Sequence, residues 1–484
     1  MTARRAAQLL AACAVALLTA CAGTPAPRPA EAPAVPAVTP QLEVVAPGDL
    51  KTLIERHLDL ARLGSLASGD TVDDSEWDRL IQAAPGQVRE LLQTEGYFDP
   101  QTRVTSEGSG SARHVRLEVS PGRRTEIGDV VIEVQGALGE AESAGDTAAA
   151  GTLADLRRAW GMPSGHVFRN ADWRDAKAAT LARLRAAGYA NAQWSGTNAE
   201  IDPESGRAKL FLVADSGPLY RLGELHIEGL VEQDELSVRN LALLPAGAPV
   251  TEAALLDYQE RLQKSGLFDS ATVTLDPDPA QAATARVDVR LHEAPLQVWT
   301  FGLGVSANTG PRASVEHAYR RVFGGPYVAR NKVQVGRLEQ LWEGEVSTNP
   351  NEKLYRSLLG GKVDRQESTS DIVLSQQVRL GRAQDTQRTE RLYFVQAERG
   401  SRVVKDTGNK VDAVALSVNA QGVWRQLDSV VLPTEGFSLS AQGGLGRAHG
   451  TDAETGPFAR LYGRFTGYLP IGYSWYGQLR VELG

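Results

Sequence analysis

From residue 296 onward, the chain alternates between apolar and polar or small positions. The first such segment interleaves large apolar residues with small or polar ones, in the order Trp299, Thr300, Phe301, Gly302, Leu303, Gly304 and Val305. A period of two predicts β-strands that have one apolar face. About eleven segments of this kind lie between Leu296 and Gly484.

The second face of these strands carries large charged residues, among them Arg379, Arg460, Arg464 and Arg480. A water-filled lumen accommodates such side chains better than the interior of a packed sandwich does. Aromatic residues near strand ends are typical of a membrane interface, and they include Tyr468, Tyr473, Trp475 and Tyr476. We therefore predict a transmembrane antiparallel β-barrel over residues 296–484, with a soluble β-sandwich as the open alternative.

Residues 42–295 contain one pattern three times. Each copy has apolar residues at helical spacing and then a glycine followed by an aromatic or apolar residue, in the segments LLQTEGYF, LRAAGYA and LQKSGLF. Glycine ends a helix because it adopts the left-handed conformation at little steric cost. The helix-stop positions predicted from this pattern are Gly96 with Tyr97, Gly188 with Tyr189, and Gly266 with Phe268.

Alternating segments follow each helix stop, for example Val115, Leu117 and Val119 in the first copy. We therefore predict three α+β units, at residues 42–124, 125–218 and 219–295. His226 lies in one of the alternating segments, and we interpret it as a surface or edge residue of a strand. The stretch GEAESAGDTAAAG, Gly139 to Gly151, is predicted to be a surface insertion of the second unit.

The N-terminus resembles an export signal, with Arg4 and Arg5 before the apolar run Leu9 to Leu18. The sequence Leu18-Thr19-Ala20-Cys21 is a lipoprotein processing signal, so we expect residues 1–20 to be removed and Cys21 to carry acyl chains. Cleavage at an ordinary signal-peptidase site remains the alternative. Residues 21–41 are rich in proline and alanine and are predicted to be an extended tether.

Composition and the search for motifs argue against several classes of function. The net charge of −8 and the pI of 5.6 argue against a nucleic-acid partner, which would require a basic face. We find none of the common nucleophile, zinc or phosphate-binding motifs, and the seven histidines are scattered singly. The sequence therefore predicts no enzyme, no catalytic residue, no metal and no cofactor.

Together, the repeated units resemble POTRA domains. The strand start formed by Pro433, Gly436 and Phe437 is similar to one found in barrels of the BamA superfamily. Three POTRA-like units followed by a barrel most resemble the TamA-like outer-membrane assembly factors of that superfamily, although those proteins usually have a plain export signal. The resemblance implies a barrel of sixteen strands, so we expect that about eleven of them are present and that the full barrel continues beyond this sequence.

The resemblance also implies a location and partners. The barrel would lie in the outer membrane, in contact with its lipid, and the POTRA domains in the periplasm. The partners would be unfolded outer-membrane proteins, including autotransporters, and a TamB-like inner-membrane-anchored protein docked around residues 42–124. The POTRA domains would bind client strands by β-augmentation.

The first barrel strand is expected to form a weak seam with the last, because Gly302 and Gly304 pack poorly. Trp299, Phe301, Leu303 and Val305 belong to the same strand, which would pair with client strands when the seam opens. Two alternatives stay open at this point: a secretion pore for one dedicated partner protein, and a lipid-anchored periplasmic scaffold.

Overall fold

The structure, a computed structural model, describes residues 41–63, 74–109, 113–306, 310–429, 431–451, 455–472 and 475–484. The predicted signal segment, Cys21 and nearly all of the tether lie outside these residues. The chain divides into two compact units, of which the first comprises residues 1–131, 161–176 and 198–210 and the second the remainder. This division crosses the second predicted α+β unit, so the domain boundaries stay predictions.

The first three-stranded sheet has the order β1-β3-β2, with β3 parallel to β1 and antiparallel to β2. Helices cover it because their apolar positions repeat at helical spacing; Ile54, Leu58 and Leu92 are fully buried with Leu117 of the central strand. The elements are β1 (Gln41–Val45), α2 (Gly48–His57), α3 (Asp59–Leu63), α4 (Asp74–Thr94), β2 (Gln101–Glu107) and β3 (His114–Ser120).

The second sheet has the order β4-β6-β5. Its strand β6 alternates strictly between buried and accessible residues, with Leu210, Leu212 and Ala214 inside, as the sequence pattern predicts. The elements are β4 (Glu126–Gln135), α5 (Ala137–Ser143), α6 (Thr147–Arg158), α7 (Asn170–Ala186), β5 (Gln193–Asp202) and β6 (Arg207–Asp215).

The stretch Gly139–Gly151, predicted to be a surface insertion of the second unit, is mostly exposed, and it forms most of α5 and the start of α6. The carboxylate of Asp146 caps α6 by accepting hydrogen bonds from the backbone N–H groups of Ala148 (2.8 Å) and Ala149 (3.2 Å). Alanine has the highest helix propensity of all residues, so this low-complexity run is a good helix former once it is capped.

The third sheet, in the order β7-β9-β8, repeats the pairing of the first, with a parallel β7–β9 pair and an antiparallel β8–β9 pair. Its core includes Tyr258, Leu262 and Val287, and it extends to Val328 and Leu354 of the segment that follows. The elements are β7 (Leu222–Glu228), α8 (Glu235–Asn240), α9 (Glu252–Lys264), β8 (Phe268–Leu275), η2 (Pro279–Thr284) and β9 (Ala285–Glu293).

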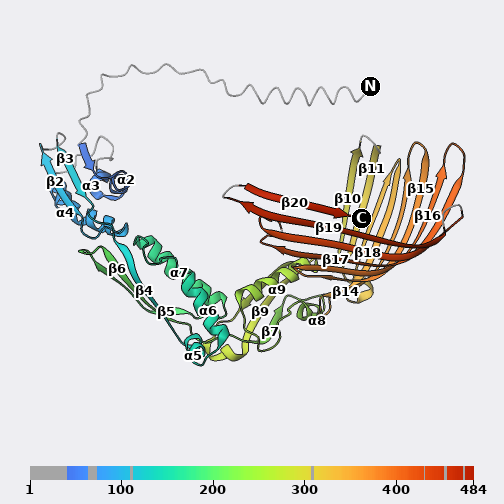
Figure 1. Cartoon of the computed structure of the whole chain (residues 1–484), viewed down its shortest axis with the longest axis horizontal. Coiled ribbons are helices and arrows are strands. Elements are labelled where there is room, and N and C mark those ends of the chain that lie inside the picture. Colours follow the sequence, from blue (N-terminus) through green and yellow to red (C-terminus); the bar gives the residue numbers. More distant parts are fainter. Residues whose placement is uncertain are drawn as a thin grey trace, which may run out of the picture. The chain divides into compact units, whose positions relative to one another are not determined.

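The remaining strands form one eleven-stranded antiparallel sheet in chain order, which Figure 1 shows as a curved surface. The predicted count of about eleven strands is thus confirmed. The strands are β10 (Gln297–Ser306), β11 (Gly310–Tyr319), β12 (Tyr327–Gly336), β13 (Glu339–Thr348), β14 (Tyr355–Glu367), β15 (Asp371–Asp385), β16 (Thr389–Val404), β17 (Lys410–Leu427), β18 (Gly436–Gly450), β19 (Gly456–Ile471) and β20 (Trp475–Leu483), with η3 (Val322–Gly324) between β11 and β12.

Among the described residues, no helix is both long enough and apolar enough to cross a membrane.

Candidate membrane face and strand edge

One face of the eleven-stranded sheet is apolar and open to the surroundings. The strand register places Leu359, Leu380, Val395, Val418 and Leu445 side by side on five consecutive strands. Four of these side chains are between 52% and 70% exposed, and the fifth, Val395, is 46% exposed. A contiguous exposed apolar surface on this scale is typical of a membrane or protein contact.

The opposite face carries charges that are paired with one another. The carboxylate of Glu345 accepts hydrogen bonds from Arg356 (2.9 Å) on the next strand and from Arg379 (2.8 Å) on the strand after it. The register places Arg460, Arg464 and Arg480 on this same face. The sequence prediction of one apolar face and one arginine-bearing face is therefore confirmed, and this polarity is that of strands lining water on one side and lipid on the other.

The predicted aromatic girdle is only partly correct. Trp475 lies on the apolar face and is 77% exposed, whereas the register puts Tyr468 and Tyr476 on the polar face. Successive strand residues point to opposite faces, so aromatic residues that are adjacent in sequence cannot all face lipid. Tyr473 lies outside the described residues.

Strand β10 is an edge of the sheet in the part of the chain that the structure describes, because it pairs only with β11. The predicted seam residues Trp299, Phe301, Leu303 and Val305 lie on the apolar face, and the last three are 73%, 91% and 86% exposed. Gly302 and Gly304 alternate with them and lie on the polar face, as the period of two predicts.

The direction of the backbone groups of β10 follows from one hydrogen bond. The N–H of Arg320 donates to the carbonyl of Leu296 at 2.9 Å, so this opposed pair is a hydrogen-bonded one. Hydrogen-bonded pairs recur at every second residue, so the even-numbered residues of β10 bond to β11. The odd-numbered residues, including Phe301 and Leu303, therefore direct both N–H and C=O toward the open edge.

The predicted strand start at residues 433–437 closes the turn before β18. Gly436 has φ of +109°, and a Cβ there would collide with the carbonyl of Gln426. Asp428 accepts hydrogen bonds from the Thr434 hydroxyl (2.5 Å) and from the N–H of Glu435 (3.0 Å). These bonds hold the pKa of Asp428 well below its usual value. Phe437 stacks against Phe465 of the neighbouring strand, with ring centroids 6.0 Å apart.

The three helix-stop glycines have a second role that the sequence pattern does not reveal. All three are left-handed as predicted, with φ values of +91°, +103° and +71° for Gly96, Gly188 and Gly266. Each carbonyl accepts a hydrogen bond from the segment that follows its unit: Gly96 from the N–H of Thr125 (2.8 Å), Gly188 from the N–H of Tyr220 (3.0 Å) and Gly266 from the guanidinium of Arg320 (2.5 Å). The repeated glycine therefore also has a junction role: its carbonyl joins the unit to the segment that follows.

The aromatic or apolar residues beside these glycines pack at the same points. The side chains of Tyr189 and Phe268 are buried, at 7% and 4% exposed. Tyr97 is half-buried under the guanidinium of Arg124, which lies 5.4 Å from the ring centroid.

The linker between β9 and the sheet is fixed at several points. The Glu293 carboxylate accepts the backbone N–H groups of Val231 to Gln233 at 2.8–3.0 Å. Arg320 donates to the carbonyl of Pro295 (2.6 Å) as well as to Gly266. Hydrogen bonds to charged groups are among the stronger ones. Sequence patterns gave no sign of the roles of Glu293 and Arg320, because neither belongs to a motif and their partners are distant in sequence.

Turns at the same end of the sheet also contact the preceding α+β unit. The Gln387 amide donates to Asp257 (2.7 Å) and Glu260 (2.8 Å) of α9. Asn349 donates to the Ser237 hydroxyl of α8 at 2.8 Å. Together with the shared core, these bonds join residues 219–295 to this end of the sheet.

The described residues contain no group of three or more His, Cys, Asp or Glu side chains arranged to hold a metal ion. His226 lies on the edge strand β7, 44% exposed at its side chain and 3.1 Å from Glu228. This is the surface position predicted for it.

The fold is similar to that of a solved structure of BamA. The structure of BamA from Haemophilus ducreyi lacking POTRA domains 1–3 matches over 72% of this chain and 68% of that chain, with 11% identity and a TM-score of 0.50. CdiB from Acinetobacter baumannii matches over 85% and 77%, with 13% identity and a TM-score of 0.35. BamA POTRA3–5 from Haemophilus influenzae matches over 52% and 94%, with 17% identity and a TM-score of 0.29.

No protein-family model matches the chain, and no curated protein sequence matches it either. At 11% identity, the likeness to BamA concerns the fold. The chain has small α+β domains followed by an antiparallel sheet, the architecture of POTRA domains followed by part of a BamA-like barrel.

Proposed function

We propose that this protein is an outer-membrane assembly or translocation factor that helps β-barrel and autotransporter proteins to fold and insert. The observation that carries the proposal is the combination of a broad exposed apolar face with a strand, β10, that pairs on one side only among the described residues. Apolar side chains on this face are 40–90% exposed, and exposing them is favourable in lipid but costs free energy in water. The BamA-like fold supports the same location, with the α+β units as three periplasmic POTRA domains at residues 42–124, 125–218 and 219–295.

The open edge of β10 supports the mechanism. Five odd-numbered residues, from Gln297 to Val305, direct N–H and C=O groups away from β11. Unpaired backbone groups within the hydrocarbon cost several kcal/mol each, so an incoming strand that pairs with them is stabilised whatever its sequence. We infer that β10 is the barrel seam and that it presents these groups to client strands.

The small sheets supply a second set of edges. Their central strands are β3, β6 and β9, which leaves two edge strands in each sheet. Of these, β5 is long and mostly exposed over Gln193–Asp202. Such an edge binds an extended client through main-chain hydrogen bonds and imposes little sequence preference.

Proline substitution tests the seam directly. The double variant Phe301→Pro with Leu303→Pro removes two N–H groups that face the open edge and leaves the bonds to β11 in place. We expect it to abolish insertion of an unfolded β-barrel client into vesicles that contain the full-length protein, while client binding by the small domains persists.

The matched control is Phe301→Ala with Leu303→Ala, which removes the same side chains but keeps the N–H groups. It should retain most of the insertion activity. Normal insertion by the proline variant would contradict the seam mechanism. Export of one dedicated partner without any insertion activity would instead favour a secretion pore.

The finer assignment to TamA-like proteins is part of the proposal. It predicts a TamB-like partner on residues 42–124, where β1 and β2 are the edge strands. Deletion of this unit should abolish co-purification of that partner, and retained binding would exclude the assignment. Acylation of Cys21 belongs to the same proposal, and the mass of the mature N-terminal peptide tests it.

A further inference from the structure

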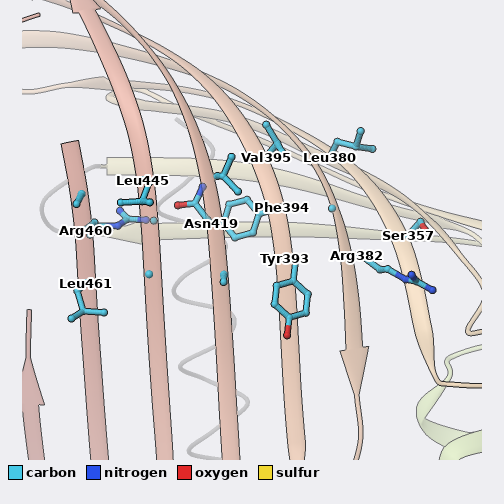
Figure 2. A pocket seen from close by; sticks show the side chains of 16 residues that line it. Ser357, Leu380, Arg382, Tyr393, Phe394, Val395, Asn419, Leu445, Arg460 and Leu461 are labelled. Atoms are coloured by element: carbon cyan, nitrogen blue, oxygen red, sulfur yellow. The ribbon is translucent and has the colours of Figure 1, made fainter. Parts of the chain in front are cut away.

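The apolar face of the sheet contains a hollow of about 960 Å³ over strands β14 to β19. Figure 2 shows the side chains around it, with Tyr393, Val395, Leu445 and Leu461 coming from neighbouring strands. The volume lies within the range of ligand sites, about 300–1,000 Å³.

The hollow exists because small residues interrupt a row of larger ones. The register places Ala420 and Gly443 between Tyr393 and Leu461 on the apolar face. A Cβ at Gly443 would have no atom within 4 Å, so the space above this glycine is open. The adjacent row, Leu380 to Leu445, supplies apolar contacts along one side.

Arg382 lines one end of this hollow, and the register places Arg391 on the same apolar face just beyond that end. Arg382 opposes Tyr393 and Arg391 opposes Gln384, which makes the two arginines diagonal neighbours on β15 and β16. The guanidinium of Arg382 lies 4.6 Å from the centroid of the Tyr355 ring. Among the described residues, neither arginine forms an ion pair with a carboxylate.

An arginine on a lipid-facing surface is costly unless it lies at headgroup level or has an anion as partner. The β15–β16 turn at this end carries Gln387, which bonds to α9. The polar end of the hollow therefore lies on the side of residues 219–295, where a leaflet would present its phosphates.

We propose that this hollow is a binding site for an anionic phospholipid, with an acyl chain over Ala420 and Gly443 and the phosphate on Arg382 and Arg391. This inference rests on the proposed function, because it requires the apolar face to lie in a membrane. The charge complementarity between two arginines without carboxylate partners and a phosphate, beside an apolar hollow, is what selects this ligand.

The test is native mass spectrometry of the full-length protein in detergent, titrated with phosphatidylglycerol and, separately, with phosphatidylcholine. We expect tighter binding of phosphatidylglycerol. Replacing Arg382 or Arg391 by Gln should weaken that binding about fivefold per arginine, because one basic residue near a phosphate surface contributes about 1 kcal/mol. Arg382→Lys should retain most of it.

Filling the hollow with a larger side chain provides an independent test of the lipid site. Gly443→Leu should abolish the bound lipid, whereas Gly463→Leu should not, since Gly463 lies on the same apolar face with equally open space but does not line the hollow. Unchanged phosphatidylglycerol affinity in Gly443→Leu and in both Gln variants would overturn the lipid site. Failure of the wild-type protein to insert into vesicles would overturn the proposed function instead.

Discussion

The small α+β domains and the eleven-stranded sheet use the same apolar residues in opposite ways. In the domain at residues 219–295, Leu262 is 0% exposed and Tyr258 is equally buried. In the sheet, Leu445 and Leu461 are 70% and 76% exposed. The domains therefore enclose their apolar side chains, whereas the sheet presents a row of them on its outer surface.

The strongest test of this contrast is a pair of leucine truncations. Leu262→Ala empties a closed core and should lower the free energy of unfolding by about 2–5 kcal/mol. Leu445→Ala removes a side chain that faces outward, and its cost in lipid should be only about 0.5 kcal/mol. Urea titration of the full-length protein in micelles, followed by pulse proteolysis, measures both. Equal losses would mean that Leu445 packs against protein.

Adding an arginine to either face of strand β17 should distinguish the two faces by the loss of stability. Val418→Arg puts a guanidinium on the apolar face and should destabilise the membrane-inserted sheet by about 2–4 kcal/mol near the bilayer centre. Ala415→Arg puts the same group on the polar face, opposite Glu398, and should be tolerated. The urea dependence of folding into vesicles reports the difference. Similar losses for the two variants would argue against a lipid-facing side.

Within the domains, two glycines should respond to alanine with opposite signs. Gly96→Ala forces a left-handed φ of +91° on alanine and pushes a Cβ into the carbonyl of Phe168, which should cost about 1–3 kcal/mol. Gly86→Ala lies inside helix α4 with no atom within 4 Å of its Cβ and should stabilise the domain by up to about 1 kcal/mol. Thermal unfolding of the two variants decides this, and a stabilising Gly96→Ala would exclude the junction role.

The smallest expected effect is the pH dependence of the contact between helix α9 and the β15–β16 turn of the sheet. Hydrogen bonds from Lys264 and then Gln387 lower the pKa of Glu260 from its ordinary value of 4.5. The contribution of this contact is therefore present above pH 4.5 and is lost as the pH falls through the lowered pKa. The protection factors for hydrogen exchange in the turn at residues 386–388, which compare the measured rates with the intrinsic rates at the same pH, should decrease below that pH. In Glu260→Gln, the acid-dependent part should disappear, and its persistence would assign the effect to another group.

Local patterns in the sequence were sufficient for several features. The helix-stop glycines, the strand alternation, the count of strands and the faces of Arg379 and Arg460 all follow from periodicity or from one residue's allowed backbone conformation. The stretch from Gly139 to Gly151 lies mostly at the surface, as expected, but its low complexity did not indicate that it forms helices. Its capping by Asp146 and the helix propensity of alanine were the stronger signals.

The sequence by itself determined which residues alternate, where helices end and which side chains share a face, because these depend on backbone geometry over a few residues. Only the tertiary structure decided what those faces meet. The Gln387–Asp257 bond joins residues 130 positions apart, and the hollow at Gly443 depends on the register of six strands. A sequence period of two fixes the face to which each side chain points, but not which residue of the next strand lies beside it. It therefore leaves undetermined both the strand register and the contacts between the sheet and residues 219–295.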